Sequence, residues 1–276
     1  GSGILDISGS IWTLGGNFTK TSGTLTMLQT TLNLEDNSTL TSDEALSFVT
    51  LNLNDFTLTL GDNSSDLTVE NAITINASGE GILTGGADLS LGALTLSAGD
   101  VTSTGGIISL LGGGQLSGSG ILDVSGSTWV LGGDFEKSGG TLTISNTDLA
   151  LVGSTTLTSN VALIFVALNL NDYALTLGSS DSDLTVQNAI TIDAITEGIF
   201  TGKADLILNR ALTMSNGRLE STGGTIKFAH GQIQTSKFSG DARMMLDNTT
   251  LTSDDGSLIA FIEIDGEPDL SMTDSS

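Results

Sequence analysis

Apolar and polar residues alternate along most of the chain. The pattern is seen in LTL at 58–60, ITI at 73–75 and LSL at 89–91. Side chains two positions apart in a strand lie on the same face, so Leu and Ile occupy one face and Thr and Ser the other. These runs span about four to six residues and are separated by Gly, Asn-Asp or Ser-Gly turns. The pattern predicts an all-β protein of short strands.

Long segments with this alternating pattern occur twice with nearly the same sequence. GSGILDISGSIWTLGGNF at 1–18 returns as GSGILDVSGSTWVLGGDF at 118–135. LNLNDFTLTLG at 51–61 returns as LNLNDYALTLG at 168–178. A catalytic motif is rarely duplicated so faithfully, whereas a structural element that stacks on its own copies requires such duplication.

The repeat predicts three segments of one continuous β-solenoid. They are a first unit at 1–117, a second unit at 118–234 and a partial third unit at 235–276. A single short strand cannot bury its apolar face, but stacked parallel coils share one interior. A unit of about 117 residues accommodates about six coils of roughly 19–20 residues each.

The repeated eleven-residue segment predicts a corner between two faces of the solenoid. Leu51 and Leu53 are expected to point inward, Asn54 and Asp55 to form the turn, and Phe56 to begin the next inward set. Asn favours such turns because its side chain hydrogen-bonds nearby backbone and because it tolerates left-handed backbone angles. A structural role is therefore favoured for this segment.

Aromatic residues are few, and two pairs of them occupy matching positions in the two units. Trp12 matches Trp129, and Phe56 matches Tyr173. We expect their apolar bulk to fill the solenoid interior or a corner, which leaves a sugar-stacking platform as the less favoured use.

The recurring GxLTL, STGG and AITI pieces resemble the repeat regions of bacterial surface β-solenoids. Filamentous-haemagglutinin-type adhesins and autotransporter passengers are examples. The resemblance is compositional and covers nearly the whole chain. It implies a right-handed parallel β-helix that is exported and displayed outside the cell. It transfers no functional residues, because such repeats are scaffold.

Charge and composition narrow the classes of partner. The chain has 32 acidic and 8 basic residues, a formal net charge of −24, and no cysteine. Such a surface repels phosphate backbones and anionic lipid, so we expect neither nucleic-acid binding nor membrane insertion. The absence of cysteine excludes disulfides and thiolate metal sites.

The sequence does not favour an enzyme. Parallel β-helices also host polysaccharide-active enzymes, which gather carboxylates with basic residues in a groove. Six of the eight basic residues lie between 203 and 243, near the lone His230, and the position matching His230 in the first unit is Gly113. A single histidine with no second copy supplies no nucleophile–base pair. No catalytic residue and no organic cofactor are predicted.

Calcium is the cofactor that the sequence leaves open. The corner loops are rich in oxygen ligands of the type that Ca²⁺ prefers, although neither a nonapeptide calcium repeat nor an EF-hand loop is present. The candidate ligands are the aspartates of two matching loops: Asp55, Asp62, Asp66, Asp172, Asp181 and Asp183. Solvated turn residues are the alternative interpretation of the same aspartates.

The expected function is a structural or adhesive segment of a large extracellular or cell-surface bacterial protein. Its expected partners are neighbouring repeats or copies of itself, packed end to end or laterally, and glycans. A glycan- or ice-binding module is the alternative, because Thr-Leu-Thr occurs at 24–26, 39–41, 57–59 and 141–143, among other places. β-strand preference explains the same threonines without ice.

Overall fold

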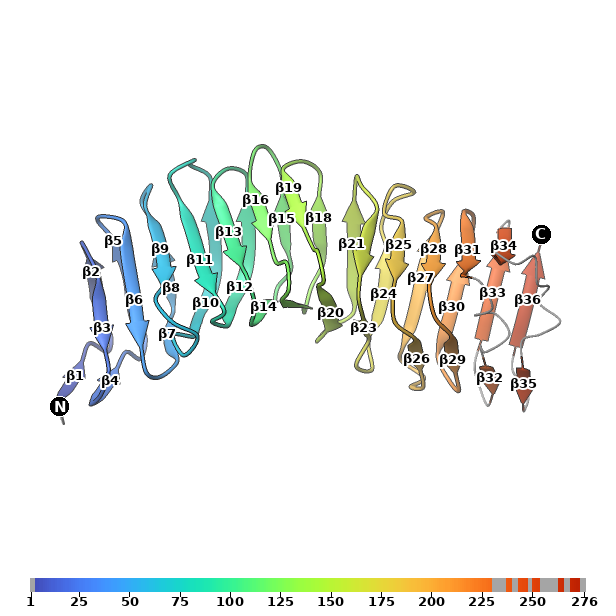
Figure 1. The fold of residues 1–276 in the computed structure, drawn as a ribbon, viewed down its shortest axis with the longest axis horizontal. Helices are drawn as coiled ribbons and strands as arrows, with labels where there is room; N and C mark the ends of the chain where they lie inside the picture. Colours follow the sequence, from blue (N-terminus) through green and yellow to red (C-terminus); the bar gives the residue numbers. More distant parts are fainter. Residues whose placement is uncertain are drawn as a thin grey trace. The chain divides into compact units, whose positions relative to one another are not determined.

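In the computed structural model, the regular elements of the described residues are all β-strands, and the strands pair in parallel with their counterparts in the next coil (Figure 1). The predicted all-β class and the stacked parallel coils of a β-solenoid are confirmed. The described residues are 3–229, 237–239, 243–247, 250–253, 263–265 and 269–273.

The chain forms two compact units. Unit one comprises residues 1–133 and 137–145, and unit two comprises 134–136 and 146–276. From here on, these two names refer to the compact units and not to the repeats of the sequence. The predicted repeat boundaries at 117 and 234 stay predictions.

Unit one contains most of the earlier strands. They are β1 (Ile4–Asp6), β2 (Ile11–Leu14), β3 (Phe18–Lys20), β4 (Thr24–Thr26), β5 (Thr31–Leu34), β6 (Ser38–Ser42), β7 (Leu46–Phe48), β8 (Thr50–Asn52), β9 (Thr57–Leu60), β10 (Leu67–Ile75), β11 (Gly81–Gly85), β12 (Leu89–Leu96), β13 (Asp100–Ser103), β14 (Ile107–Leu110), β15 (Gly114–Leu116), β16 (Ile121–Asp123), β17 (Thr128–Leu131) and β19 (Thr141–Thr143). Strand β18 (Phe135–Lys137) has residues of both units.

Unit two contains the later strands. They are β20 (Asp148–Leu151), β21 (Thr155–Ser159), β22 (Leu163–Phe165), β23 (Leu168–Asn169), β24 (Ala174–Leu177), β25 (Leu184–Val186), β26 (Ile190–Ile192), β27 (Gly198–Gly202), β28 (Leu206–Leu208), β29 (Leu212–Met214), β30 (Arg218–Ser221), β31 (Thr225–Phe228), β32 (Lys237–Ser239), β33 (Arg243–Asp247), β34 (Thr250–Ser253), β35 (Glu263–Asp265) and β36 (Asp269–Thr273).

The register places each residue opposite one that comes a single coil later in the chain. In unit one, Ile4 lies opposite Thr24, 20 residues on, and Thr31 lies opposite Thr50, 19 residues on. These two pairs match the coil length of roughly 19–20 residues expected from the sequence, but other coils are longer, since Thr57 lies opposite Gly81, 24 residues on, and Arg218 opposite Arg243, 25 residues on. Matching residues of successive coils therefore form rows along each face.

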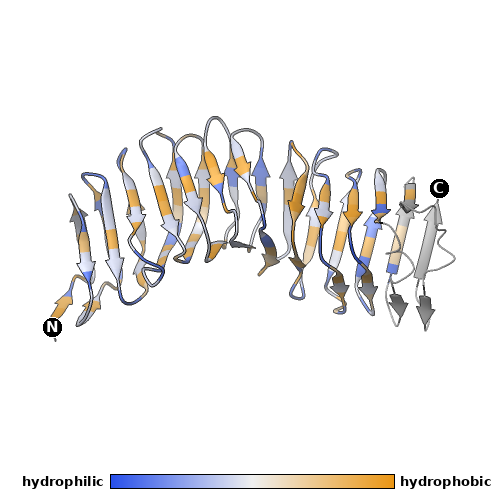
Figure 2. Cartoon of the chain, viewed as in Figure 1, coloured by the Kyte–Doolittle hydropathy of each residue, from blue (hydrophilic) through white to orange (hydrophobic). Residues whose placement is uncertain are grey.

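The alternation of the sequence becomes an alternation of burial. Apolar and polar bands follow one another along the strands in Figure 2. Leu51 and Leu53 are buried, as predicted. Trp129 is fully buried and fills the interior, also as predicted. Phe56 and Tyr173 sit at their corners, where Tyr173 keeps 37% of its surface exposed.

Candidate functional site

The repeated corner is a left-handed turn in both units. Asn54 and Asp55 have φ angles of 52° and 71°, and Asn171 and Asp172 have 51° and 71°. Asn and Asp tolerate this region better than other residues with a side chain. The predicted Asn-Asp turn is confirmed.

The asparagine of each turn binds the preceding coil. Asn54 Nδ2 donates to the Leu34 carbonyl at 3.0 Å, and Asn171 Nδ2 donates to the Leu151 carbonyl at 2.9 Å. The left-handed turn therefore also supplies a link between coils.

A buried glutamate joins the same turn to the next coil. Glu80 Oε2 accepts the backbone N–H groups of Asn76 at 2.8 Å and Ala77 at 3.1 Å. Its other oxygen, Oε1, accepts the N–H of Asp55 at 3.5 Å. Charge-assisted bonds to backbone N–H groups compensate a carboxylate for lost water.

Unit two repeats this arrangement around Glu197. Glu197 Oε2 accepts the N–H groups of Asp193 at 2.7 Å and Ala194 at 3.1 Å, and Oε1 accepts the N–H of Asp172 at 3.2 Å. Our sequence reasoning missed both glutamates. The available signal was that Glu80 and Glu197 lie 117 positions apart in a chain with a repeat of that length.

A glycine of the following coil packs on the corner. Gly99 has φ +69°, and a Cβ there would lie 2.3 Å from the Glu80 carbonyl oxygen. Gly217 has φ +70°, and its Cβ would lie 2.6 Å from the Glu197 carbonyl oxygen. We call the sets Asn54–Glu80–Gly99 and Asn171–Glu197–Gly217 the corner columns. Each links successive coils of one unit.

Two of the six calcium candidates perform similar links. Asp66 Oδ1 accepts the N–H of Asp88 at 2.9 Å, and Asp183 Oδ1 accepts the N–H of Asp205 at 2.8 Å. Both donors lie one coil later. These carboxylates thus serve as backbone caps between coils.

The remaining calcium candidates are dispersed. Asp62 accepts the N–H of Ser64 at 3.0 Å and the hydroxyl of Ser65 at 2.8 Å, which closes its own loop. Asp181 is exposed in the matching loop of unit two. Asp55 and Asp172 lie instead on the corner turns, with exposed side chains.

The structure thus brings Asp62 and Asp66 into one loop and Asp181 and Asp183 into another. The aspartates of the corner turns belong to neither loop. Within the residues that the structure describes, no group of three or more His, Cys, Asp or Glu side chains is arranged to hold a metal ion. Calcium binding stays a prediction.

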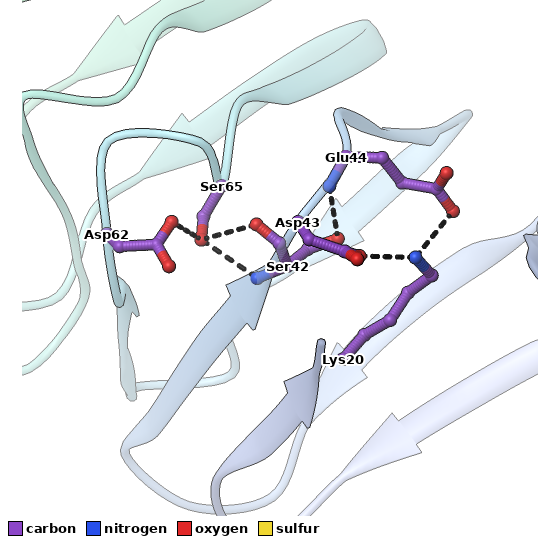
Figure 3. A network of polar contacts seen from close by, with 6 residues as sticks. All are labelled: Lys20, Ser42, Asp43, Glu44, Asp62 and Ser65. Carbon is purple, nitrogen blue, oxygen red and sulfur yellow. Dashed lines mark hydrogen bonds and ion pairs between the residues drawn. The ribbon is translucent and has the colours of Figure 1, made fainter. Parts of the chain in front are cut away.

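A buried lysine forms the main ionic cluster of unit one (Figure 3). Lys20 Nζ lies 2.5 Å from Asp43 Oδ1 and 3.0 Å from Glu44 Oε1. The adjacent Ser42 N–H donates to the Ser65 hydroxyl at 2.9 Å. The cluster therefore connects three consecutive coils.

The lysine and Asp43 shift each other's titration. The hydrogen bond to Asp43 raises the pKa of Lys20. The same bond lowers the pKa of Asp43. In the second copy of the sequence repeat the lysine is kept as Lys137, but Asn160 and Val161 replace the two acids.

The substitution Asp43→Asn introduces the residue that the second copy of the repeat has at the matching position. It is expected to change how the free energy of unfolding depends on pH in the acid range. With its pKa lowered by folding, Asp43 stabilises the folded state above the unfolded pKa of about 4, and this contribution is lost as pH falls through the folded pKa. Lys20 acts oppositely: its contribution is complete below about 10.5 and is lost at higher pH. Urea unfolding of both proteins from pH 2 to 7 measures the difference. Parallel pH profiles would contradict the assignment.

Threonine rows on the outer surface are interrupted. One row in unit one runs through Thr59, Leu83, Thr102, Asp123 and Thr143 on strands β9, β11, β13, β16 and β19. Thr-Leu-Thr segments fall on consecutive coils of this sheet at β6 and β9, where Thr39 lies opposite Thr59, but the next three strands, β11, β13 and β16, carry none. An ice-binding face of the kind considered above would require an uninterrupted run of such segments.

The basic segment is only partly described, and His230 lies outside the described residues. Arg218 pairs with Glu220, Nη1 to Oε1 at 3.3 Å, and lies opposite Arg243 in the sheet register. No helix in the described part of the chain has the length and apolar character needed to cross a membrane.

Comparison with known proteins adds no family. No family model matches the chain, and no curated protein or solved structure matches it either.

Proposed function

We propose that the chain is a scaffold segment of a large bacterial protein displayed outside the cell, where its stacked coils provide length and support adhesion. The observation that carries the proposal is the use of the corner polar groups. Asn54, Glu80 and Asp66 all bind backbone of other coils, as do their matches in unit two. Two of the aspartates that first suggested ligand chemistry, Asp66 and Asp183, are thus used to hold coils together.

Length in this proposal follows coil number. Neighbouring strands lie about 4.8 Å apart, so each coil extends the scaffold by about that distance. The net charge of −24 keeps neighbouring scaffolds apart by repulsion. Neighbouring repeats and copies of the same protein are the proposed partners, with glycans as ligands of an adhesive surface.

The location is tested by fractionating the native source and probing with an antibody raised against this segment. We expect a very large polypeptide that remains with the cell surface or extracellular matrix. A freely secreted band near 28.1 kDa, the mass of this chain, would contradict the scaffold proposal and favour a glycan- or ice-binding module.

A further inference from the structure

The first coil of unit one has a pairing edge that nothing in the described part of the chain covers. Strand β1 pairs with β4, β2 with β5 and β3 with β6, each on one side only. An edge of this kind presents unpaired N–H and C=O groups to an incoming strand.

The same end of the unit exposes apolar side chains. Ile4 is 78% exposed, Leu5 45% and Ile11 68%. A hollow of about 320 Å³ lies beside Ile4 and Leu5 and is also lined by Phe18 and Lys20. We call this region the first-coil face. Exposed apolar surface next to an open strand edge is typical of an interaction site.

The chain itself shows what covers this face. The matching segment, 118–131, has nearly the same sequence and lies beneath the coil of β13, β14 and β15. There Val101 lies opposite Leu122 and Ile108 opposite Trp129.

Burial differs between the matching residues accordingly. Leu122 and Trp129 are 0% exposed, whereas Leu5 is 45% exposed and Trp12 is only partly buried. Residues of the same type at matching positions are thus buried where a preceding coil covers them and more exposed where the described part of the chain supplies no such coil.

We propose that the first-coil face is a docking surface for one further coil of the same repeat, with the side-chain pattern of residues 98–117. The register follows from the matching pairs. The position of Val101 in the incoming coil would lie opposite Leu5, and that of Ile108 opposite Trp12. The proposal rests on the proposed scaffold function and specifies how the scaffold is extended at this end.

The test joins a second copy of residues 98–117 directly ahead of residue 1, so that the junction Ser117–Gly118 is reproduced. Trp129 is fully buried, so acrylamide quenching of the parent reports chiefly on Trp12. We expect quenching to fall severalfold in the extended protein, and amide hydrogen exchange in residues 4–20 to slow by about tenfold or more. Sedimentation velocity accompanies both measurements.

A second extended protein serves as the control. In the added coil alone, the residues corresponding to Val101, Ile108 and Leu110 are replaced by Asp, so chain length is kept and apolar burial is lost. Equal quenching and exchange in the two extended proteins would overturn the proposal. A parent that sediments as a dimer with Trp12 already protected would overturn it too, because a second copy would then be the occupant. Neither result would affect the cell-surface fractionation or the length measurement below.

Discussion

Gly99→Ala is expected to destabilise unit one by about 3 kcal/mol or more. The added Cβ would lie 2.3 Å from the Glu80 carbonyl oxygen and 2.7 Å from the Ala77 carbonyl oxygen. Both neighbours are backbone, so rotation of a side chain cannot relieve the overlap. The positive φ of 69° adds its own cost. Equilibrium urea unfolding measures the change.

Gly9→Ala separates the two causes. Gly9 has the same φ of +69°, but nothing lies within 4 Å of its Cβ position. Its substitution is expected to cost about 1–2 kcal/mol, the price of the backbone conformation alone. Gly217→Ala should resemble Gly99→Ala, because the Glu197 carbonyl oxygen takes the place of that of Glu80. Equal losses at Gly9 and Gly99 would show that the corner column is not tightly packed.

Glu80→Ala is the second large expected effect, a loss of about 2–4 kcal/mol. The substitution removes the acceptor for the N–H groups of Asn76 and Ala77 and for that of Asp55 in another coil. Buried donors left without a partner cost more than the bond itself contributes. Chemical unfolding gives the loss, and hydrogen exchange at Asn76 and Ala77 locates it.

Matched variants make this second test specific. Glu197→Ala should cost a similar amount, since Glu197 makes the same three bonds in unit two. Glu70→Ala removes an exposed carboxylate and should change stability by less than about 0.5 kcal/mol. A Glu80→Ala loss no larger than that of Glu70→Ala would contradict the role assigned to the buried glutamates.

The sequence predicted those features that depend on local pattern. The inward positions of Leu51 and Leu53 follow from the alternation, and the Asn54–Asp55 turn follows from local backbone preference. Glu80 could not be recognised in this way. One of its partners, Asp55, lies 25 residues earlier, and only the coil register brings the two together.

The aspartates show the same difference between local and non-local information. The sequence indicated oxygen-rich loops around Asp62 and Asp66, and such loops are present. It could not show that Asp66 caps the N–H of Asp88, 22 residues later. Composition identifies the acceptor, whereas the stacking of coils determines its donor.

Trp12 and Trp129 show that burial also depends on the neighbouring coil. The two residues occupy matching places in the repeat, so the sequence predicts one environment for both. Trp129 lies beneath Ile108 and is fully buried, while Trp12 packs edge-on against Phe18 with ring centroids 4.8 Å apart and stays partly exposed.

Length as a function of repeat number tests the central claim most directly. One additional copy of residues 1–117 is inserted ahead of residue 118, and the maximum dimension of both proteins is measured by small-angle X-ray scattering. With about six coils at about 4.8 Å each, the longer protein should gain about 29 Å at unchanged cross-section. A gain in cross-section without that gain in length would contradict a scaffold built by stacking coils.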